Sequence, residues 1–194
     1  MPDTVTDKRT MRERMLAGDL YRGDDPELVA EMRRAMDLTK RFNDSDPHDA
    51  DGRRSLLADL LGTIGDDVEI RPPMFVDYGS HIRIGARTFI NFGLTALDVA
   101  AITIGDDVLV GPNVQLLTPI HPIAPEPRRA KWEAALPIQI ENNVWIGGLA
   151  VICPGVTVGR DSVVGAGTVV TKDVPPGSIA VGNPARVVSS VHDA

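Results

Sequence analysis

Four histidines are the side chains best suited to acid–base chemistry in this chain. His48 falls in a polar loop and His192 in the C-terminal tail, so both are expected to be solvated. His81, in YGSHIRIG, is expected to be a polar surface residue. His121 differs because it lies in TPIHPI, where two prolines stiffen the backbone around it. An imidazole with an ordinary pKa of about 6.5 can accept a proton from a reacting group. His121 is therefore the candidate for proton transfer.

The residues on either side of this loop form a repeat with a period of six. Aliphatic residues occupy one position of the repeat: Ile140, Ile146, Ile152, Val158, Val164 and Val170. Small or β-branched residues follow four places later: Val144, Ala150, Val156, Ser162, Thr168 and Val174. This period is typical of a parallel β-helix, in which each hexamer supplies one short strand and a corner. A sandwich of short strands would show irregular spacing instead.

The repeat also appears earlier in the chain, but out of phase, in IGDDVE, IGARTF and IGDDVLVG. We expect a β-helix over residues 61–190, interrupted by a loop insertion at 118–137. Rigid scaffolds often hold functional residues on such loops. Four residues give this insertion a cationic and aromatic tip, which would either reach over a neighbouring cleft or stay solvated: Arg128, Arg129, Lys131 and Trp132.

Residues 1–60 predict an N-terminal helical region. DDPELVAEMRRAMDLTKRFN spaces its apolar residues as a helix does, and Pro26 suits the first turn. RSLLADLLG reads as a second amphipathic helix that Gly62 can end. Two or three short helices are therefore expected before the β-helix.

The composition is that of an ordinary globular protein, with 194 residues, 43% of them hydrophobic and 24% charged. A net charge of −7 and 4% aromatic residues argue against a nucleic-acid partner. No run approaches the roughly 20 apolar residues of a membrane span. The polar start MPDTVTDKRTMRERM resembles no export signal, so a cytoplasmic location without membrane contact is expected.

Two further side chains bear on chemistry. Cys153 is the sole cysteine, which excludes an intramolecular disulfide and a multi-cysteine zinc site. It directly follows a position of the aliphatic ladder, so we expect a small packing residue rather than a covalent relay. Trp145 is too large for a narrow coil and should project from its surface, either between subunits or beside a ligand.

The ladder, taken with NNVWIGGLAVICPGVTVGRDSVVGAGTVVTKDVPPGSIAVGNPARVV, resembles the hexapeptide-repeat acyltransferases. MLAGDLY and LLADLLG narrow the resemblance to the maltose/galactoside O-acetyltransferase group, from about Arg12 to Val188. The resemblance implies a mainly β chain with a left-handed parallel β-helix, and a homotrimer whose active sites lie between subunits. Handedness follows from the resemblance alone, since parallel connections are usually right-handed.

The same resemblance implies an enzyme that moves acetyl from acetyl-CoA to a hydroxyl of maltose, glucose or a galactoside. His121 matches the family's histidine in HPI and would be the general base in a direct attack. The thioester is already activated, so no enzyme nucleophile is required, and no metal is expected. Gly148, after WIG, would donate its backbone N–H to the oxyanion, although a glycine there also suits a tight corner.

For the cofactor, the resemblance points to contacts from Trp145, Gly148, Ala166, Thr171 and Lys172. Because CoA carries several phosphate charges and the chain is acidic, Lys172 and Arg186 are expected to supply local cations. Lys172 equally suits an ordinary solvated position. This chain departs from the family at Ser189, where a basic residue can stand.

For the acceptor, the resemblance points to Asp77 in FVDYGS, Asn91 in FINFG and Asp98 in TALDVA. Carboxylates and amides bind several hydroxyls well, which suits a sugar. These residue types are also common at β-helix corners. After the LY pair the chain departs from the family, and Asp24 or Asp25 would supply a carboxylate there.

Three other functions remain open from the residues. The same base and cofactor would serve an acetyltransferase for another hydroxyl or an amine, such as an antibiotic or a nodulation-type oligosaccharide. A β-helical zinc lyase needs three histidines, whereas only His81 and His121 fall in the coil region. A non-catalytic trimeric scaffold would need neither His121 in a stiff loop nor Lys172 in the last coil.

Overall fold

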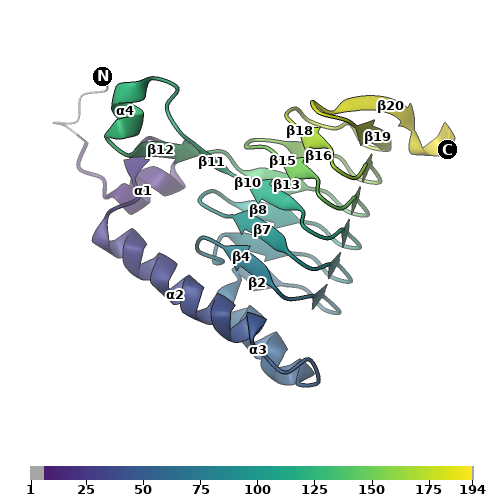
Figure 1. Ribbon diagram of the computed structural model, residues 1–194, viewed down its shortest axis with the longest axis horizontal. Helices are drawn as coiled ribbons and strands as arrows, with labels where there is room; N and C mark the ends of the chain where they lie inside the picture. Colours follow the sequence, from purple (N-terminus) through teal and green to yellow (C-terminus); the bar gives the residue numbers. More distant parts are fainter. Residues whose placement is uncertain (1–6, 194) are drawn as a thin grey trace.

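The aliphatic ladder lines the interior of a parallel β-helix in the computed structural model, which describes residues 7–193 (Figure 1). All six ladder residues from Ile140 to Val170 have no exposed surface. The positions four places later are buried as well, none of them more than 4% exposed. The fold predicted from the period of six is therefore confirmed. Burial of this apolar column is the main stabilising contribution that the repeat makes.

Three sheets form the faces of the coil, and their strands pair parallel except for the last pair, β19 with β20. The first contains β2 (Thr63–Ile64), β5 (Ile82–Ile84), β8 (Ile102–Ile104), β13 (Ile138–Ile140) and β16 (Thr157–Val158). The second contains β3 (Glu69–Ile70), β6 (Phe89–Ile90), β9 (Leu109–Val110), β14 (Trp145–Ile146), β17 (Val163–Val164), β19 (Ser178–Val181) and β20 (Arg186–Ser190). The third contains β4 (Met74–Val76), β7 (Leu94–Leu97), β10 (Gln115–Leu117), β15 (Val151–Ile152) and β18 (Val169–Val170).

The register explains why the early repeats are out of phase. Ile64 pairs with Ile84 and Ile84 with Ile104, so these coils take 20 residues each. Ile140 pairs with Val158, so the later coil takes 18 residues, or three hexamers. The two extra residues in each early coil enlarge a corner and leave the inward column intact.

Three helices precede the coil: α1 (Met11–Leu16), α2 (Pro26–Asn43) and α3 (Ala50–Leu60). The Asp25 carboxylate caps α2 by accepting a hydrogen bond from the N–H of Glu27, and Pro26 opens its first turn as predicted. Phe42 and Leu60 are fully buried and join the same core as the ladder. The two longer helices therefore cover the first coil, as Figure 1 shows.

The insertion folds back onto the N-terminal region. It contains β11 (Pro119–Ile120), α4 (Pro125–Arg129) and β12 (Trp132–Ala135), and β12 pairs antiparallel with both β11 and β1 (Tyr21–Arg22). Trp132 lies opposite Arg22 in this small sheet and is half-buried. The cationic and aromatic tip is thus divided: Trp132 packs within a strand, while the arginines stay on exposed α4.

The chain ends in an antiparallel pair, β19 with β20, followed by η1 (Val191–Asp193). This pair extends from the coil at the end away from the helices (Figure 1). Within residues 7–193 no helix combines the length and apolar character required to cross a bilayer.

Candidate active site

His121 follows β11 directly and faces a cavity of about 670 Å³ beneath the insertion. Its side chain is 58% exposed, so it is available to a ligand. The cavity is lined by Gly23, Asp24, Met32, His121, Arg128, Lys131 and Glu133. The nearest carboxylate is that of Glu133, whose Oε2 lies 3.9 Å from His121 Nε2. This distance is too long for a hydrogen bond, so Glu133 acts on the imidazole through its charge.

The β1–β12 pairing holds Glu133 in this position, opposite Tyr21. Burial, and then the negative charge of Glu133, raise the pKa of Tyr21 far above its ordinary value, so its phenol stays protonated. The sequence reasoning missed Glu133. The available signal was weak, since a single carboxylate in a non-repeating loop has no periodic position to mark it.

The structure also separates the two acidic residues that follow the LY pair. Asp24 lines the His121 cavity and accepts a hydrogen bond of 2.5 Å from Arg22. Asp25 is occupied as the cap of α2. Of the two, Asp24 is the one that lines the same cavity as His121.

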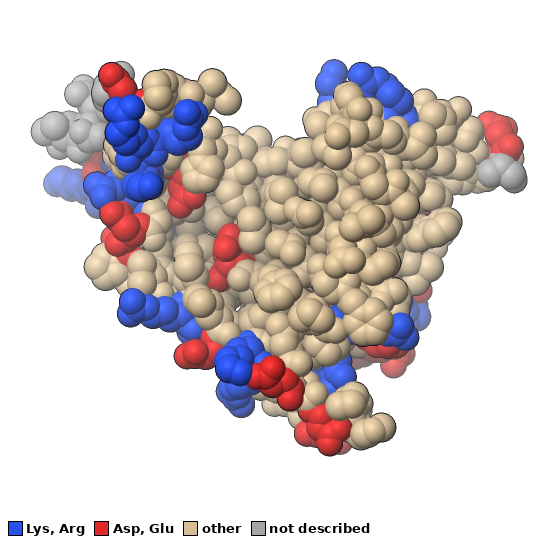
Figure 2. Space-filling model, viewed as in Figure 1, with Lys and Arg blue, Asp and Glu red and all other residues tan. Residues whose placement is uncertain are grey.

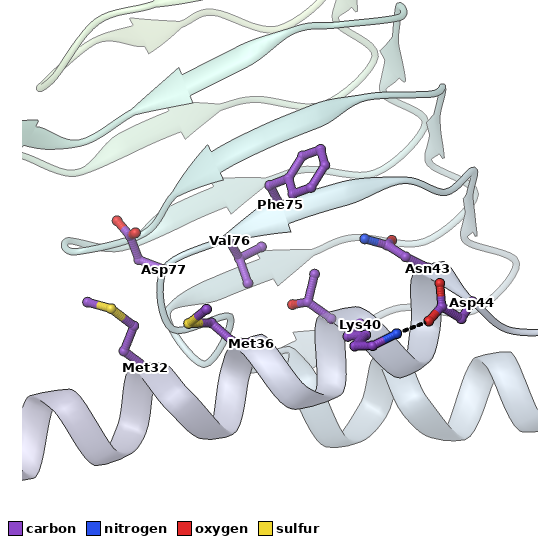
Figure 3. A pocket seen from close by; sticks show the side chains of 9 residues that line it. Met32, Met36, Lys40, Asn43, Asp44, Phe75, Val76 and Asp77 are labelled. Carbon is purple, nitrogen blue, oxygen red and sulfur yellow. Dashed lines mark hydrogen bonds and ion pairs between the residues drawn. The ribbon is translucent and has the colours of Figure 1, made fainter.

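Asp77 directly follows β4 and lines an apolar groove of about 490 Å³ between α2 and β4 (Figure 3). Met32 lines this groove and also the His121 cavity, so the two are neighbours. Figure 3 shows Asp77 and Met32 at one end, and the Lys40–Asp44 ion pair at the other. Burial, followed by the charges of Asp98 and Glu133, raises the pKa of Asp77 to about 6. Asp77 therefore changes its charge close to neutral pH.

Asp98, predicted to bind the acceptor, lies inside the fold. Its side chain has no exposed surface, and its carboxylate accepts hydrogen bonds from the N–H groups of Asp77, Tyr78 and His81. The Asp98 carbonyl lies 2.6 Å from His81 Nδ1 as well. The hydrogen bonds of the Asp98 carboxylate fix the loop that carries Asp77, and its contact with an acceptor stays a prediction. His81 is correspondingly half-buried rather than a free surface residue.

A separate groove of about 460 Å³, called the Gly148 groove below, runs along the face of β6, β9, β14 and β17. Four of the residues predicted to bind substrates line it: Asn91, Trp145, Gly148 and Ala166. Trp145 is 54% exposed, so it projects from the coil as its size predicts. The Asn91 side chain accepts a hydrogen bond from its neighbour Phe92 through Oδ1.

Gly148 is placed to offer a free backbone donor to this groove. Its carbonyl accepts a hydrogen bond of 2.9 Å from Gly167, but its N–H donates none within residues 7–193. A Cβ at Gly148 would lie 3.1 Å from Pro112, and a Cβ at neighbouring Gly147 would clash with the backbone of Ala166 at 2.5 Å. The two glycines therefore shape a tight corner and leave one N–H open.

Thr171, Lys172 and Arg186 are exposed at the far end of the coil and are not among the residues that line the groove. Figure 2 shows a hollow between the insertion and the last coils, with Lys and Arg side chains on both of its rims. Cys153 packs against the core, as expected of a small packing residue. One chain thus holds His121 in one cavity and Gly148 in another.

Comparison with known proteins agrees with this architecture. Residues 14–65 match the maltose acetyltransferase hexapeptide capping motif, and residues 137–172 match the bacterial transferase hexapeptide repeat. Galactoside O-acetyltransferase of Escherichia coli K12 is 43% identical over 183 residues, which is 94% of this chain and 90% of the relative. The chain belongs to the maltose/galactoside family of hexapeptide-repeat O-acetyltransferases.

A second relative and a solved structure are similarly close. Nodulation protein L of Rhizobium meliloti is 48% identical over 179 residues, covering 92% of this chain and 98% of the relative. The solved structure of a galactoside acetyltransferase in complex with coenzyme A has a TM-score of 0.92 and 42% identity, over 95% of this chain and 92% of that one. The protein is accordingly an acyltransferase with acetyl-CoA as its co-substrate.

The family's co-substrate needs a groove with an apolar wall and backbone donors, and the cavity at Trp145 and Gly148 offers both. Among residues 7–193 there is no cluster of three or more His, Cys, Asp or Glu side chains able to hold a metal ion.

Proposed function

We propose that this acetyltransferase acetylates a hydroxyl of a sugar such as maltose, glucose or a galactoside, with His121 as general base. The observation that carries the proposal is the exposed imidazole beside Glu133, in a cavity lined by polar side chains that suit several hydroxyls. Asp24 and Asp77 add carboxylates close to this cavity. Asp98 contributes by holding the Asp77 loop.

The transfer is a direct displacement. His121 takes the proton of the acceptor hydroxyl while its oxygen bonds to the thioester carbonyl carbon. The nearby Glu133 carboxylate stabilises the positive charge that forms on the imidazole. The tetrahedral oxyanion then collapses, the carbon–sulfur bond breaks, and the CoA thiolate leaves and takes up the proton from the imidazolium.

Gly148 stabilises the oxyanion in this scheme. Its N–H is held by a rigid corner and has no other acceptor among the described residues, so it needs no reorganisation when negative charge forms. Trp145 and Ala166 border the bound pantetheine arm in the groove. Thr171, Lys172 and Arg186, at the end of the coil, face the phosphates of CoA.

The complete site requires two subunits of a homotrimer. His121 and Gly148 occupy separate cavities of one chain, and direct transfer needs both at the same thioester. The groove face also exposes large apolar side chains, including Leu109 and Trp145, each about half exposed. Such a stripe is typical of a surface that another subunit covers. In this arrangement the insertion of one subunit brings His121 to the groove of the next.

A second acceptor class follows from the comparison. The 48% identity with Nodulation protein L keeps an acetyltransferase for another hydroxyl or an amine, such as a nodulation-type oligosaccharide, as the alternative. The base, the groove and the order of bond changes would be the same. Only the side chains around Asp24 and Asp77 would meet a different acceptor.

The test measures thiol release from acetyl-CoA with galactosides, maltose, glucose and small amines as acceptors. We expect turnover with at least one sugar and, in His121→Ala, a loss of about 10²- to 10⁴-fold in kcat. His48→Ala is the matched control, because His48 is an exposed loop histidine far from the cavity lining. Turnover with amines alone would contradict a sugar as the acceptor. An undiminished kcat in His121→Ala would contradict the role of His121 as general base.

A further inference from the structure

We propose that Arg128 is a positioning residue for the reaction, since its guanidinium clamps the loop that carries His121. Arg128 Nη1 donates to the carbonyl of Pro122 at 3.0 Å and to that of Ile123 at 2.7 Å. These are the two residues that follow His121 directly. The inference rests on the proposed role of His121 as base, and it adds the group that keeps the imidazole in place.

The backbone around His121 needs such a clamp because strand pairing stops just before it. β11 ends at Ile120, which pairs with Ala134 of β12. The chain next enters regular structure at Pro125, the first residue of α4. Ala124 caps α4 without a side-chain hydrogen bond. Two prolines restrict the backbone dihedrals here, but they donate no hydrogen bonds that would hold the segment against the rest of the insertion.

Arg128 is suited to this task by both charge and shape. A guanidinium is always charged and presents its donors in a rigid planar fork, so one nitrogen can serve two carbonyls. α4 carries it from the C-terminal side of the same loop, which closes the segment on itself. Both hydrogen bonds use Nη1. Arg128 also lines the His121 cavity, where the acceptor is proposed to bind.

The kinetic test compares Arg128→Ala, Arg128→Lys and Arg129→Ala. Arg129 is the matched control, because it is exposed on the same short helix and its side chain makes no hydrogen bond or ion pair within residues 7–193. A misplacement of about 1 Å in a catalytic group can cost as much as 10²-fold in rate. We expect kcat to fall about tenfold or more in Arg128→Ala, with the KM for acetyl-CoA changed less than about twofold.

Chemical rescue separates positioning from general damage. Guanidinium ion at about 20 mM, well below denaturing concentrations, should restore part of kcat in Arg128→Ala and leave Arg129→Ala and His121→Ala unchanged. Arg128→Lys should retain an intermediate kcat, because an ammonium still donates to carbonyls. A kcat of Arg128→Ala close to that of the wild type, or a loss that neither guanidinium nor lysine relieves, would overturn the proposal.

A readout without turnover makes the clamp testable by itself. With histidine rings labelled with ¹³C, and the His121 signal assigned through His121→Gln, the clamp predicts a change in that signal in Arg128→Ala. The line should narrow toward that of exposed His48, because the loop becomes mobile on the fast timescale. An unchanged His121 signal would refute the clamp, whereas full activity of His121→Ala would refute only the proposed base.

Discussion

Asp77 is the residue whose environment alters its chemistry most clearly. It directly follows β4, its N–H donates to the buried Asp98 carboxylate, and the charges of two carboxylates, Asp98 and Glu133, act on it. Burial and these charges make its neutral form favourable in the folded chain, with a pKa of about 6. A sugar hydroxyl beside Asp77 would therefore meet an acceptor-only carboxylate above this pH and a protonated donor below it.

The stability of the chain should record this shift. Because the folded pKa of Asp77 lies above its ordinary value of 3.8, the folded state holds the proton more tightly than the unfolded state. The free energy of unfolding should therefore fall as pH rises from about 4 to 6. Asp77→Asn has no carboxyl to ionise. Its free energy of unfolding, relative to that of the wild type, should therefore increase by about 2 kcal/mol between pH 4 and pH 7.

Denaturant unfolding at both pH values measures the difference. Asp37→Asn, an exposed change on α2, should show the same free energy relative to the wild type at pH 4 and pH 7. If Asp77→Asn behaves like Asp37→Asn, burial does not raise the pKa of Asp77. Acceptor binding through Asp77 would then not depend on pH near 6.

At the scale of elements, the coil and the insertion follow different rules. The coil repeats one rule, an inward aliphatic residue followed by a tight corner, and each strand needs only its neighbours above and below. The insertion is held by pairing between residues far apart in the sequence, such as Tyr21 with Glu133. The coil is a source of stability, and the insertion carries the proposed base His121.

Ile140→Ala tests the coil rule. Ile140 is fully buried between Ile104 and Val158, so truncation should lower the free energy of unfolding by about 2 to 5 kcal/mol. Gln139→Ala, one residue earlier and pointing outward, should cost less than about 1 kcal/mol. Urea unfolding of the two variants gives the comparison. Equal losses of unfolding free energy would contradict the placement of Ile140 in the core of the coil.

This contrast explains what the sequence could predict. A strict period of six identifies the buried face without any knowledge of distant contacts, so Ile140 and its equivalents were assigned correctly. The partnership of His121 with Glu133 depends on a strand pair between β1 and β12, for which no local pattern exists. The burial of Asp98 could not be predicted for a related reason, because an aspartate beside a corner looks the same whether it faces solvent or backbone N–H groups.

At the scale of the molecule, the distribution of groups argues for assembly. The proposed base His121 and its carboxylate neighbours gather beneath the insertion, while Gly148 and Trp145, proposed to contact the oxyanion and the cofactor, lie on another face. A head-to-tail contact between identical subunits joins two different surfaces, and three such contacts close a ring. The central claim is that His121 of one subunit works over the Gly148 groove of its neighbour.

Complementation between two inactive variants tests this claim most directly. His121→Ala lacks the base, and Ala166→Glu places a negative side chain in the cofactor groove, so each variant alone should release almost no thiol from acetyl-CoA. Co-expressed in equal amounts, they should recover about one quarter of the wild-type rate, because one interface in four then joins an intact His121 to an intact groove. A mixed preparation that stays as inactive as the single variants would contradict a site shared between subunits.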